Sequence, residues 1–287
     1  MKSKNSFVRA IINADDLGIS LSVNKQIEDC IKRGVVSSTT LLVNAPAFAD
    51  GVRIAKSYPH VSVGIHLNLI EFAPLTNVDV FKEFGVVGSD GNFVEGAIFV
   101  ANCRDKRLRK AVFEEWDAQI TKFEAAGLKP THIDSHEHTH TIIPLQDVLC
   151  AVMDKHGINR VRRKTNPSIR LMLRGRRHPD TVHLDKSKAI VRKKRNVVFR
   201  RFHVFVAKYY SIWWNHRMSK RYVLTDSFYA FRVFLSNRDI IPTGKTVELM
   251  CHPGHKSYQS ETESLLNPSN WNKEVSIISY NDLVINK

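Results

Sequence analysis

Apolar, β-branched stretches alternate along this chain with stretches of helical periodicity, and this alternation constrains the fold more than any other feature. The first apolar stretch, FVRAIIN at residues 7–13, is typical of a buried strand and leads into the turn DDLG at 15–18. Ser22 then caps a predicted helix that Gly34 ends. Further strands are predicted at 38–44, 61–69, 131–135, 158–163 and 246–251, and further helices at 106–126 and 146–155. Such alternation predicts a mainly parallel sheet or an α/β barrel.

Polar residues with catalytic chemistry stand where these predicted strands end. They are Asp15, Asp16, His66, His136 and His252. In α/β barrels the carboxyl ends of the strands meet at one face, and active sites are built there. We therefore expect these side chains to lie close together in space.

The segment THIDSHEHTH at residues 131–140 is the densest of these signals, with four histidines and two carboxylates. If 132–140 were one strand, its alternate side chains would share a face but span about 26 Å, at about 3.3 Å per residue. One metal ion cannot bind them all, so the segment should supply one ligand and other strand ends the rest. The adjacent carboxylates Asp15 and Asp16 repel each other unless a cation or a shared proton relieves them. Together these patterns favour a divalent metal with three protein ligands and an open position for water.

The 287 residues can bury one large core, so we predict a single domain over 1–287, interrupted by a basic amphipathic insertion at 164–222. The four cysteines form no CxxC pair, which indicates a reducing compartment. The N-terminal stretch lacks the apolar core of a signal peptide, and no apolar run is long enough to span a membrane. The expected location is cytoplasmic, with a possible peripheral contact to the inner face of the membrane.

The net charge of +15 is concentrated in one part of the chain. Residues 160–221 contain 20 Lys and Arg against two Asp, whereas the remainder carries 23 basic and 26 acidic residues. Residues 193–221 can be laid on a helix with an aromatic and aliphatic face that includes Phe205, Tyr209, Ile212 and Trp213. Such a helix either packs on the barrel with a solvated basic face or lies on an anionic membrane, and its tryptophans could equally stack on sugar rings.

Four motifs occur in the same order as in a known family: NADDLG, GIHLNL, THIDSHEHTH and ELMCHPGH. With them the chain resembles the YdjC/ChbG-type carbohydrate deacetylases. The resemblance implies a distorted (β/α) barrel of the glycoside hydrolase/deacetylase type and one divalent metal ion. It also implies that Asp16, His66 and His136 hold the metal, that Asp15 is the general base, and that His252 is the general acid.

Some positions are less firmly placed by the resemblance. The family often has Phe where Leu17 stands and His where Glu137 stands. Arg162 resembles an arginine of the family's Val-Arg strand and could orient groups or bind substrate, or it could be a solvated charge beside the basic segment. Asp134 could orient a ligand histidine. His138, like His132 and His140, could contact a metal ligand, bind sugar hydroxyls or be exposed.

The function predicted from these residues is metal-dependent hydrolysis of the acetamido group of an N-acetylated sugar, with Mg²⁺ or Zn²⁺ as the metal. The substrate would be an N-acetylated oligosaccharide or a lipid-linked sugar, and a homo-oligomer is possible. A barrel phosphoesterase or another metal-dependent amidohydrolase would use similar residues. A nucleic-acid-binding protein with structural histidines is disfavoured, because the charge outside the basic segment is nearly balanced and no nucleic-acid-binding motif is present.

Overall fold

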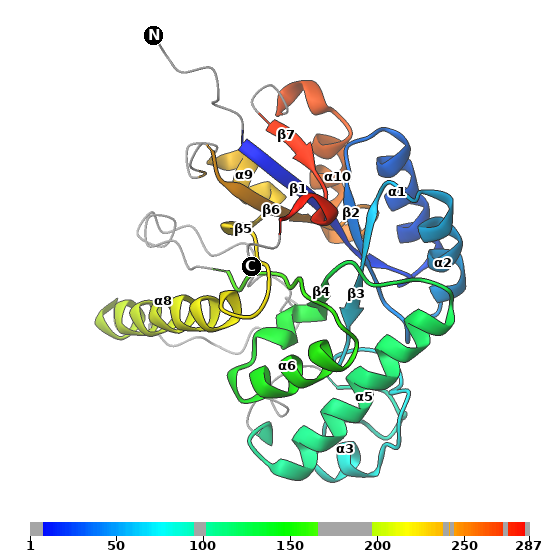
Figure 1. Ribbon diagram of the computed structural model, residues 1–287, viewed down its shortest axis with the longest axis vertical. Coiled ribbons are helices and arrows are strands. Elements are labelled where there is room, and N and C mark those ends of the chain that lie inside the picture. The colour runs from blue at the N-terminus through cyan, green and yellow to red at the C-terminus, as the bar shows by residue number, and fades with distance from the viewer. Residues whose placement is uncertain are drawn as a thin grey trace.

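A parallel β-sheet that curls into an incomplete barrel forms the centre of the molecule (Figure 1). The computed structural model describes residues 8–94, 102–165, 197–237, 241, 244–271 and 275–284, with only the backbone described at 197–204. The strands are β1 (Val8–Leu17), β2 (Ser38–Leu41), β3 (Ser62–Leu67), β4 (Ile133–Ser135), β5 (Ser227–Ala230), β6 (Thr246–Cys251) and β7 (Val275–Ile278). Their order is β4-β3-β2-β1-β6-β5, and β7 pairs with the first half of β1. The predicted distorted barrel is confirmed.

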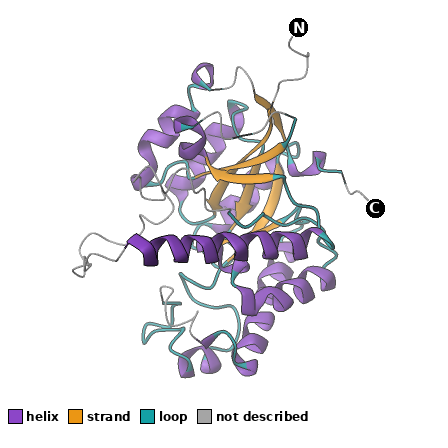
Figure 2. Cartoon of the chain, turned by 90° about the vertical axis from the view of Figure 1, so that its left-hand side faces the viewer, coloured by secondary structure: helices purple, strands orange, loops and turns teal. Residues whose placement is uncertain are grey.

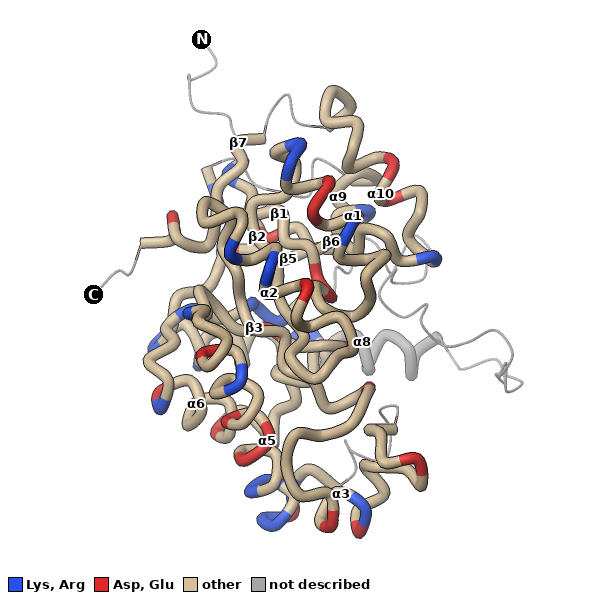
Figure 3. The backbone as a smooth tube through the Cα atoms, turned by 90° about the vertical axis from the view of Figure 1, so that its right-hand side faces the viewer, with Lys and Arg blue, Asp and Glu red and all other residues tan. Residues whose placement is uncertain are grey.

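Helices cover the outside of this sheet (Figure 1). They are α1 (Leu21–Lys32), α2 (Phe48–Ser57), α3 (Asp79–Glu83), α5 (Lys106–Ala125), α6 (Gln146–Lys155), α8 (Val197–Ser219), α9 (Phe231–Ser236) and α10 (Gln259–Leu265). Helices α1 and α2 contact β1 and β2, α5 contacts β3 and α6, and α9 contacts β6. Lys and Arg are interspersed with Asp and Glu on α3, α5 and α6 (Figure 3). This mixture agrees with the balanced charge outside the basic segment.

Several predicted elements begin or end at other residues than expected. Helix α1 is capped by Ser20, whose backbone is extended and whose Oγ accepts from the backbone N–H of Val23, and not by Ser22. The strand predicted at 158–163 is reduced to two isolated bridges, at Arg160 and Val161. Its backbone still lies along β4, because the N–H of Arg162 donates to the carbonyl of Ile133. This pairing places Arg162 beside β4, the strand at one end of the sheet order.

The two faces of the sheet differ in polarity. Side chains that point outward, such as those of Ile12, Leu41 and Leu249, join the helices in one large apolar core. Many of the side chains that point inward are polar and buried, and they hydrogen-bond to one another. The directly bonded set is Asn13, Asp15, Thr40, His66 and Asp134, and the buried Glu248 is linked to Asp15 through Arg162. The barrel interior therefore holds a polar network instead of the usual apolar filling.

Helix α8 lies as a long rod across one side of the barrel (Figure 2). It confirms the helix predicted within 193–221, whereas residues 166–196 of the predicted insertion lie outside the described residues. The face that α8 buries is not the predicted apolar one, because Trp214 and Met218 are buried while Tyr209 and Ile212 are exposed. Among the residues that the structure describes, no helix combines the length and the apolarity needed to cross a bilayer.

Candidate active site

The pair Asp15 and Asp16 lies at an irregularity near the end of β1. Consecutive side chains of a regular strand point to opposite faces, which would separate the two carboxylates. Here the pairing of β1 with β2 shifts register between Ala14 and Leu17, and Asp16 has a positive φ of 67°. Such a bulge re-aims a side chain, and Asp tolerates the left-handed conformation better than most residues. Both carboxylates consequently line one cavity.

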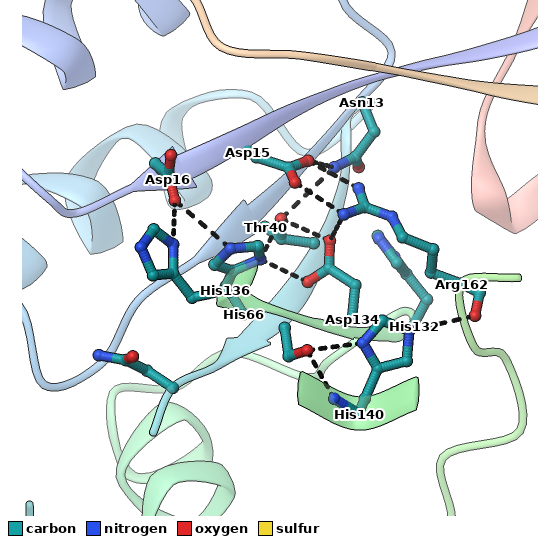
Figure 4. A network of polar contacts seen from close by, with 12 residues as sticks. Asn13, Asp15, Asp16, Thr40, His66, His132, Asp134, His136, His140 and Arg162 are labelled. Atoms are coloured by element: carbon teal, nitrogen blue, oxygen red, sulfur yellow. Dashed lines mark hydrogen bonds and ion pairs between the residues drawn. The ribbon is translucent and has the colours of Figure 1, made fainter. Parts of the chain in front are cut away.

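Asp16, His66 and His136 converge at the mouth of the barrel (Figure 4). One potential ligand atom from each residue lies within 4.8 Å of the other two. Oδ1 of Asp16 is 2.9 Å from Nδ1 of His136 and 3.4 Å from Nε2 of His66. One carboxylate and two imidazoles are a donor set that suits a divalent transition metal and also accepts Mg²⁺.

A second carboxylate orients His66 from behind. Nδ1 of His66 lies 2.6 Å from Oδ1 of Asp134, and Thr40 donates to the other oxygen of Asp134 at 3.0 Å. With Nδ1 occupied in this way, Nε2 of the ring faces Asp16, which is the arrangement that metal-binding histidines adopt. Burial lowers the pKa of His66, but Asp134, Asp16 and Asp15 outweigh burial and raise it to about 10. The local field thus favours a positive charge, which fits a cation-binding position.

Arg162 joins Asp15, Asp134 and Glu248 in a fully buried network (Figure 4 shows the first two). Its two terminal nitrogens donate to both oxygens of Asp15 at 2.6 and 2.7 Å, which is a bidentate pair. The nitrogen that meets Oδ2 of Asp15 also lies 2.7 Å from Oδ2 of Asp134, and Nε donates to Glu248 at 2.7 Å. Arg162 is therefore a buried residue behind the cavity, and the interpretation as a solvated surface charge is wrong.

The charges in this network shift the pKa values of its acids. Burial raises the pKa of Asp15, but the Arg162 guanidinium outweighs burial and holds that pKa well below its usual range. Burial likewise raises the pKa of Glu248, and here Arg162 offsets it only in part, so the pKa is about 7. Of the two carboxylates Asp15 and Glu248 on this guanidinium, Glu248 is the one that retains a proton more easily.

Glu248→Gln is expected to flatten the pH dependence of stability. Because the folded-state pKa of Glu248 lies above its unfolded value of 4.5, its contribution is fully present below pH 4.5 and disappears as the pH rises through about 7. Between pH 5 and 8 the wild type should lose on the order of 1–3 kcal/mol of unfolding free energy through this group. Urea unfolding at several pH values would measure this loss. Burial also raises the pKa of Glu261 to about 7, so the difference between variant and wild type isolates Glu248. Parallel profiles for the two proteins would contradict the assignment.

The segment after β4 turns sharply instead of continuing as a strand. Residues His136–Thr141 form a 3₁₀ turn in which Glu137 and His138 both have positive φ, at 51° and 56°. This turn sends the histidines in different directions. His136 and His138 line the cavity. The ring of His140 is instead buried against Trp214, and its Nδ1 forms a hydrogen bond with the hydroxyl group of Ser135.

His132 packs inside the barrel and away from the cavity. Its ring stacks on Tyr280 at 3.6 Å between centroids. A Cβ at Gly64 would come within 2.5 Å of that ring, so the glycine in GIHL leaves room for His132 and not for a ligand. Tyr280 donates in turn to Glu248, which extends the buried network. His132 and His140 are consequently structural residues.

His252 follows β6 and faces the same cavity. Its backbone N–H donates to Glu261 at 2.9 Å, and its ring stacks on Tyr258 at 4.6 Å between centroids. The cavity has a volume of about 340 Å³. It is lined by Asp15, Asp16, Ile19, His66, Ile70, Glu71, Ser135, His136, Glu137, His138, Met250, His252, His255 and Tyr258. Apart from His132 and His140, the candidate site residues singled out from the sequence line this cavity or, in the case of Asp134 and Arg162, lie behind it.

Sequence reasoning missed Glu248 and Thr40, although both contact residues of the site. Glu248 stands in the apolar strand TVELMC, where a single carboxylate has no partner visible in the sequence. Its position in a buried strand was the available signal, because a buried carboxylate requires a charged or hydrogen-bonding partner.

The chain is similar in sequence to known proteins. The sequence matches the family described as YdjC-like protein over residues 9–283, which is nearly the whole chain. The chain belongs to the YdjC-like family. Two similar proteins are each named carbohydrate deacetylase: one from Halalkalibacterium halodurans, 34% identical over 151 residues, and one from Clostridium beijerinckii, 36% identical over 156 residues. Each match covers 53% of this chain, and it covers 62% and 58% of the respective relatives. The matched part thus spans about three fifths of the length of these relatives.

A solved structure shares the fold of this YdjC-like chain. It is the crystal structure of a candidate cellobiose-phosphate cleavage protein from Enterococcus faecalis V583. The two chains superpose with a TM-score of 0.67 at 23% identity, over 98% of this chain and all of the other. The incomplete parallel barrel is therefore an architecture already seen in a crystal.

Proposed function

We propose that this YdjC-like chain is a metal-dependent carbohydrate deacetylase, which hydrolyses the acetamido group of an N-acetylated sugar. One observation carries the proposal: the cluster of Asp16, His66 and His136 shares a cavity with a further carboxylate, Asp15, and a further histidine, His252. The names of the similar proteins support the same reaction. Hydrolysis of an amide needs an activated water, a base and a proton donor, and these residue types can supply all three.

Asp16, His66 and His136 would hold one divalent metal ion, Mg²⁺ or Zn²⁺. When bound, the ion would lower the pKa of its water and polarise the acetyl carbonyl. Asp134 keeps His66 in the orientation that metal binding needs, through the 2.6 Å contact with its Nδ1. Asp16 is ionised at neutral pH, because His136 and His66 lower its pKa although burial opposes them.

Asp15 would act as the general base. Asp15 lines the cavity, and its carboxylate is fixed in direction by the bidentate contact with Arg162. The low pKa keeps this carboxylate ionised over the physiological pH range, so it is available to take the proton of the attacking water. Arg162 would thus position the base and hold its charge without touching the substrate.

His252 would act as the general acid. As the bond between the acetyl carbon and the sugar nitrogen breaks, the imidazolium gives its proton to that nitrogen, because an amide anion is a poor leaving group. The products are acetate and a sugar amine. Stacking on Tyr258 and the anchoring of the His252 backbone by Glu261 hold the ring at the cavity wall.

The cavity also suggests how a sugar would be held. Ile19, Ile70 and Met250 provide apolar surface suited to an acetyl methyl group and to the hydrophobic face of a pyranose ring. His138 and Glu137, in the turn after β4, also line the cavity and would hydrogen-bond to sugar hydroxyl groups. The volume of about 340 Å³ fits one or two sugar units. The substrate would be an N-acetylated oligosaccharide or the sugar of a lipid-linked acceptor.

Acetate release tests the proposal directly. Protein stripped of metal would be incubated with N-acetylglucosamine oligosaccharides and with lipid-linked acetylamino sugars, with and without added Mg²⁺ or Zn²⁺. We expect acetate to appear only when metal is restored, and the more active donor would name the substrate class. If no donor released acetate although the chain held one metal ion, the reaction proposed here would be wrong and phosphoesters would be tried next.

A further inference from the structure

Helix α8 presents its apolar side to solvent. Phe205, Tyr209 and Ile212 follow the helical spacing i, i+4 and i+7 and are exposed by 65%, 69% and 50%. Trp213 and Tyr210 extend the same surface, with ring centroids 6.3 Å apart. We call these five residues the outer face of α8. A helix that packs on a protein core normally places its apolar residues inward, so this orientation needs a partner outside the described structure.

The opposite side of α8 is anchored to the barrel. Trp214 and Met218 are completely or almost completely buried, and the side chain of Asn215 bonds to both the backbone N–H and the carbonyl of Lys164. The ring of Trp214 also packs edge-on against His140. The orientation of the C-terminal half of the helix is therefore fixed by these contacts, and the outer face cannot turn inward.

The charge on α8 is of one sign. Residues 197–221 contain six Lys and Arg and no acidic residue. Arg217 and Arg221 pair with Asp147 and Asp154 at the surface. Of the basic side chains that the structure describes in this stretch, Lys208 and Lys220 therefore supply the attraction to an external anionic partner. An exposed stripe of aromatic and aliphatic side chains with a surplus of basic residues is the pattern of a helix that lies in a bilayer interface.

We propose that the outer face of α8 docks on an anionic lipid surface. Tyr and Trp are the side chains that settle at the depth of the lipid headgroups, while Phe205 and Ile212 would enter the acyl boundary. A second copy of the chain is a poorer occupant, because residues 197–221 contain six basic and no acidic residues and two copies of this helix would repel each other. The proposal concerns a surface separate from the cavity and does not depend on the proposed reaction.

Vesicle sedimentation with the full chain tests this proposal. We expect the wild type to bind vesicles that contain phosphatidylglycerol, to bind pure phosphatidylcholine vesicles much more weakly, and to lose binding as salt is raised. The triple variant Phe205→Gln, Tyr209→Gln, Ile212→Gln should partition at least about tenfold less onto the anionic vesicles, because it loses the apolar insertion. All three side chains are exposed, so the variant should fold normally, which circular dichroism and thermal unfolding would verify.

Leu21→Gln is the matched control, since Leu21 is 68% exposed on α1, away from this helix. It should bind vesicles as the wild type does. The proposal is overturned if the wild type ignores anionic vesicles, if it binds neutral vesicles equally well, or if the triple variant binds like the wild type. It is also overturned if the triple variant converts a lipid-free oligomer into a monomer, because the outer face would then be an interface between copies of the chain.

Discussion

Asp16→Ala should leave the folded protein without a retained metal ion and without measurable turnover. Asp16 is the single carboxylate among the three converging residues proposed as ligands, and both imidazoles lie within 3.4 Å of its Oδ1. Without it, two neutral ligands would compete poorly with water for a divalent ion, and we expect turnover to fall by at least about 10⁴-fold. Metal content after gel filtration, measured by elemental analysis, and acetate release would report the two effects.

Two further variants separate ligand loss from backbone strain. Asp16 has a positive φ of 67°, a conformation that costs Ala about 1 kcal/mol or more. Asp16→Gly removes the carboxylate without that strain and should behave like Asp16→Ala. Glu71→Ala removes a carboxylate that lines the same cavity and approaches Nε2 of His136 only to 4.0 Å, and it should retain the metal. A metal content that depends on Glu71 and not on Asp16 would refute the assignment.

Asp15→Asn should retain the metal and lose turnover by about 10²- to 10⁴-fold, the range expected for removal of a general base. The amide has the shape of the carboxylate but cannot accept a proton at neutral pH. One of its two terminal atoms becomes a donor that faces Arg162, so we also expect some loss of unfolding free energy, on the order of 1–3 kcal/mol. Steady-state turnover, metal content and thermal unfolding should be measured on the same preparation.

Glu248→Gln serves as the control for Asp15→Asn. It alters a carboxylate on the same guanidinium, but Glu248 does not line the cavity. If Asp15 contributed only by neutralising Arg162, the two variants would lose similar amounts of turnover. Turnover that falls strongly in Asp15→Asn and modestly in Glu248→Gln would identify Asp15 as the group that takes the proton.

The parts of the site that sequence could predict are those fixed by topology. Strands that run parallel bring their carboxyl ends to one face, so residues as distant as Asp16, His66 and His136 were expected to meet there, and their side chains do converge. Topology could not predict which histidines of residues 131–140 line the cavity and which pack in the protein interior. Their directions depend on the positive φ angles of Glu137 and His138, and propensity does not predict two consecutive non-glycine residues in that conformation.

The side-chain contacts across the barrel interior could not be predicted from the sequence either. Arg162 stands at the edge of the most basic part of the sequence. A strand was predicted at 158–163, but only one backbone bridge joins it to β4, and the pattern did not show that Arg162 would be buried. The role of Glu248 could not be inferred without knowing that Arg162 lies beside it and donates to it. For α8, periodicity identified the helix and its apolar side but could not say whether that side faces the protein. The anchors on the opposite side, Trp214, Asn215 and Met218, decide this, and their partners are distant in sequence.

The bulge in β1 has a consequence for how the site operates. The proposed base and the proposed metal ligand are neighbours on one chain, so their Cα atoms are about 3.8 Å apart whatever else moves. Lids and domain closures in other enzymes assemble such groups at each turnover and lose conformational entropy each time. Here the assembly is completed once, when β1 folds into the centre of the sheet between β2 and β6. This part of the site is preorganised by covalent connection, so binding energy from the proposed sugar substrate would remain available for orienting its acetyl group.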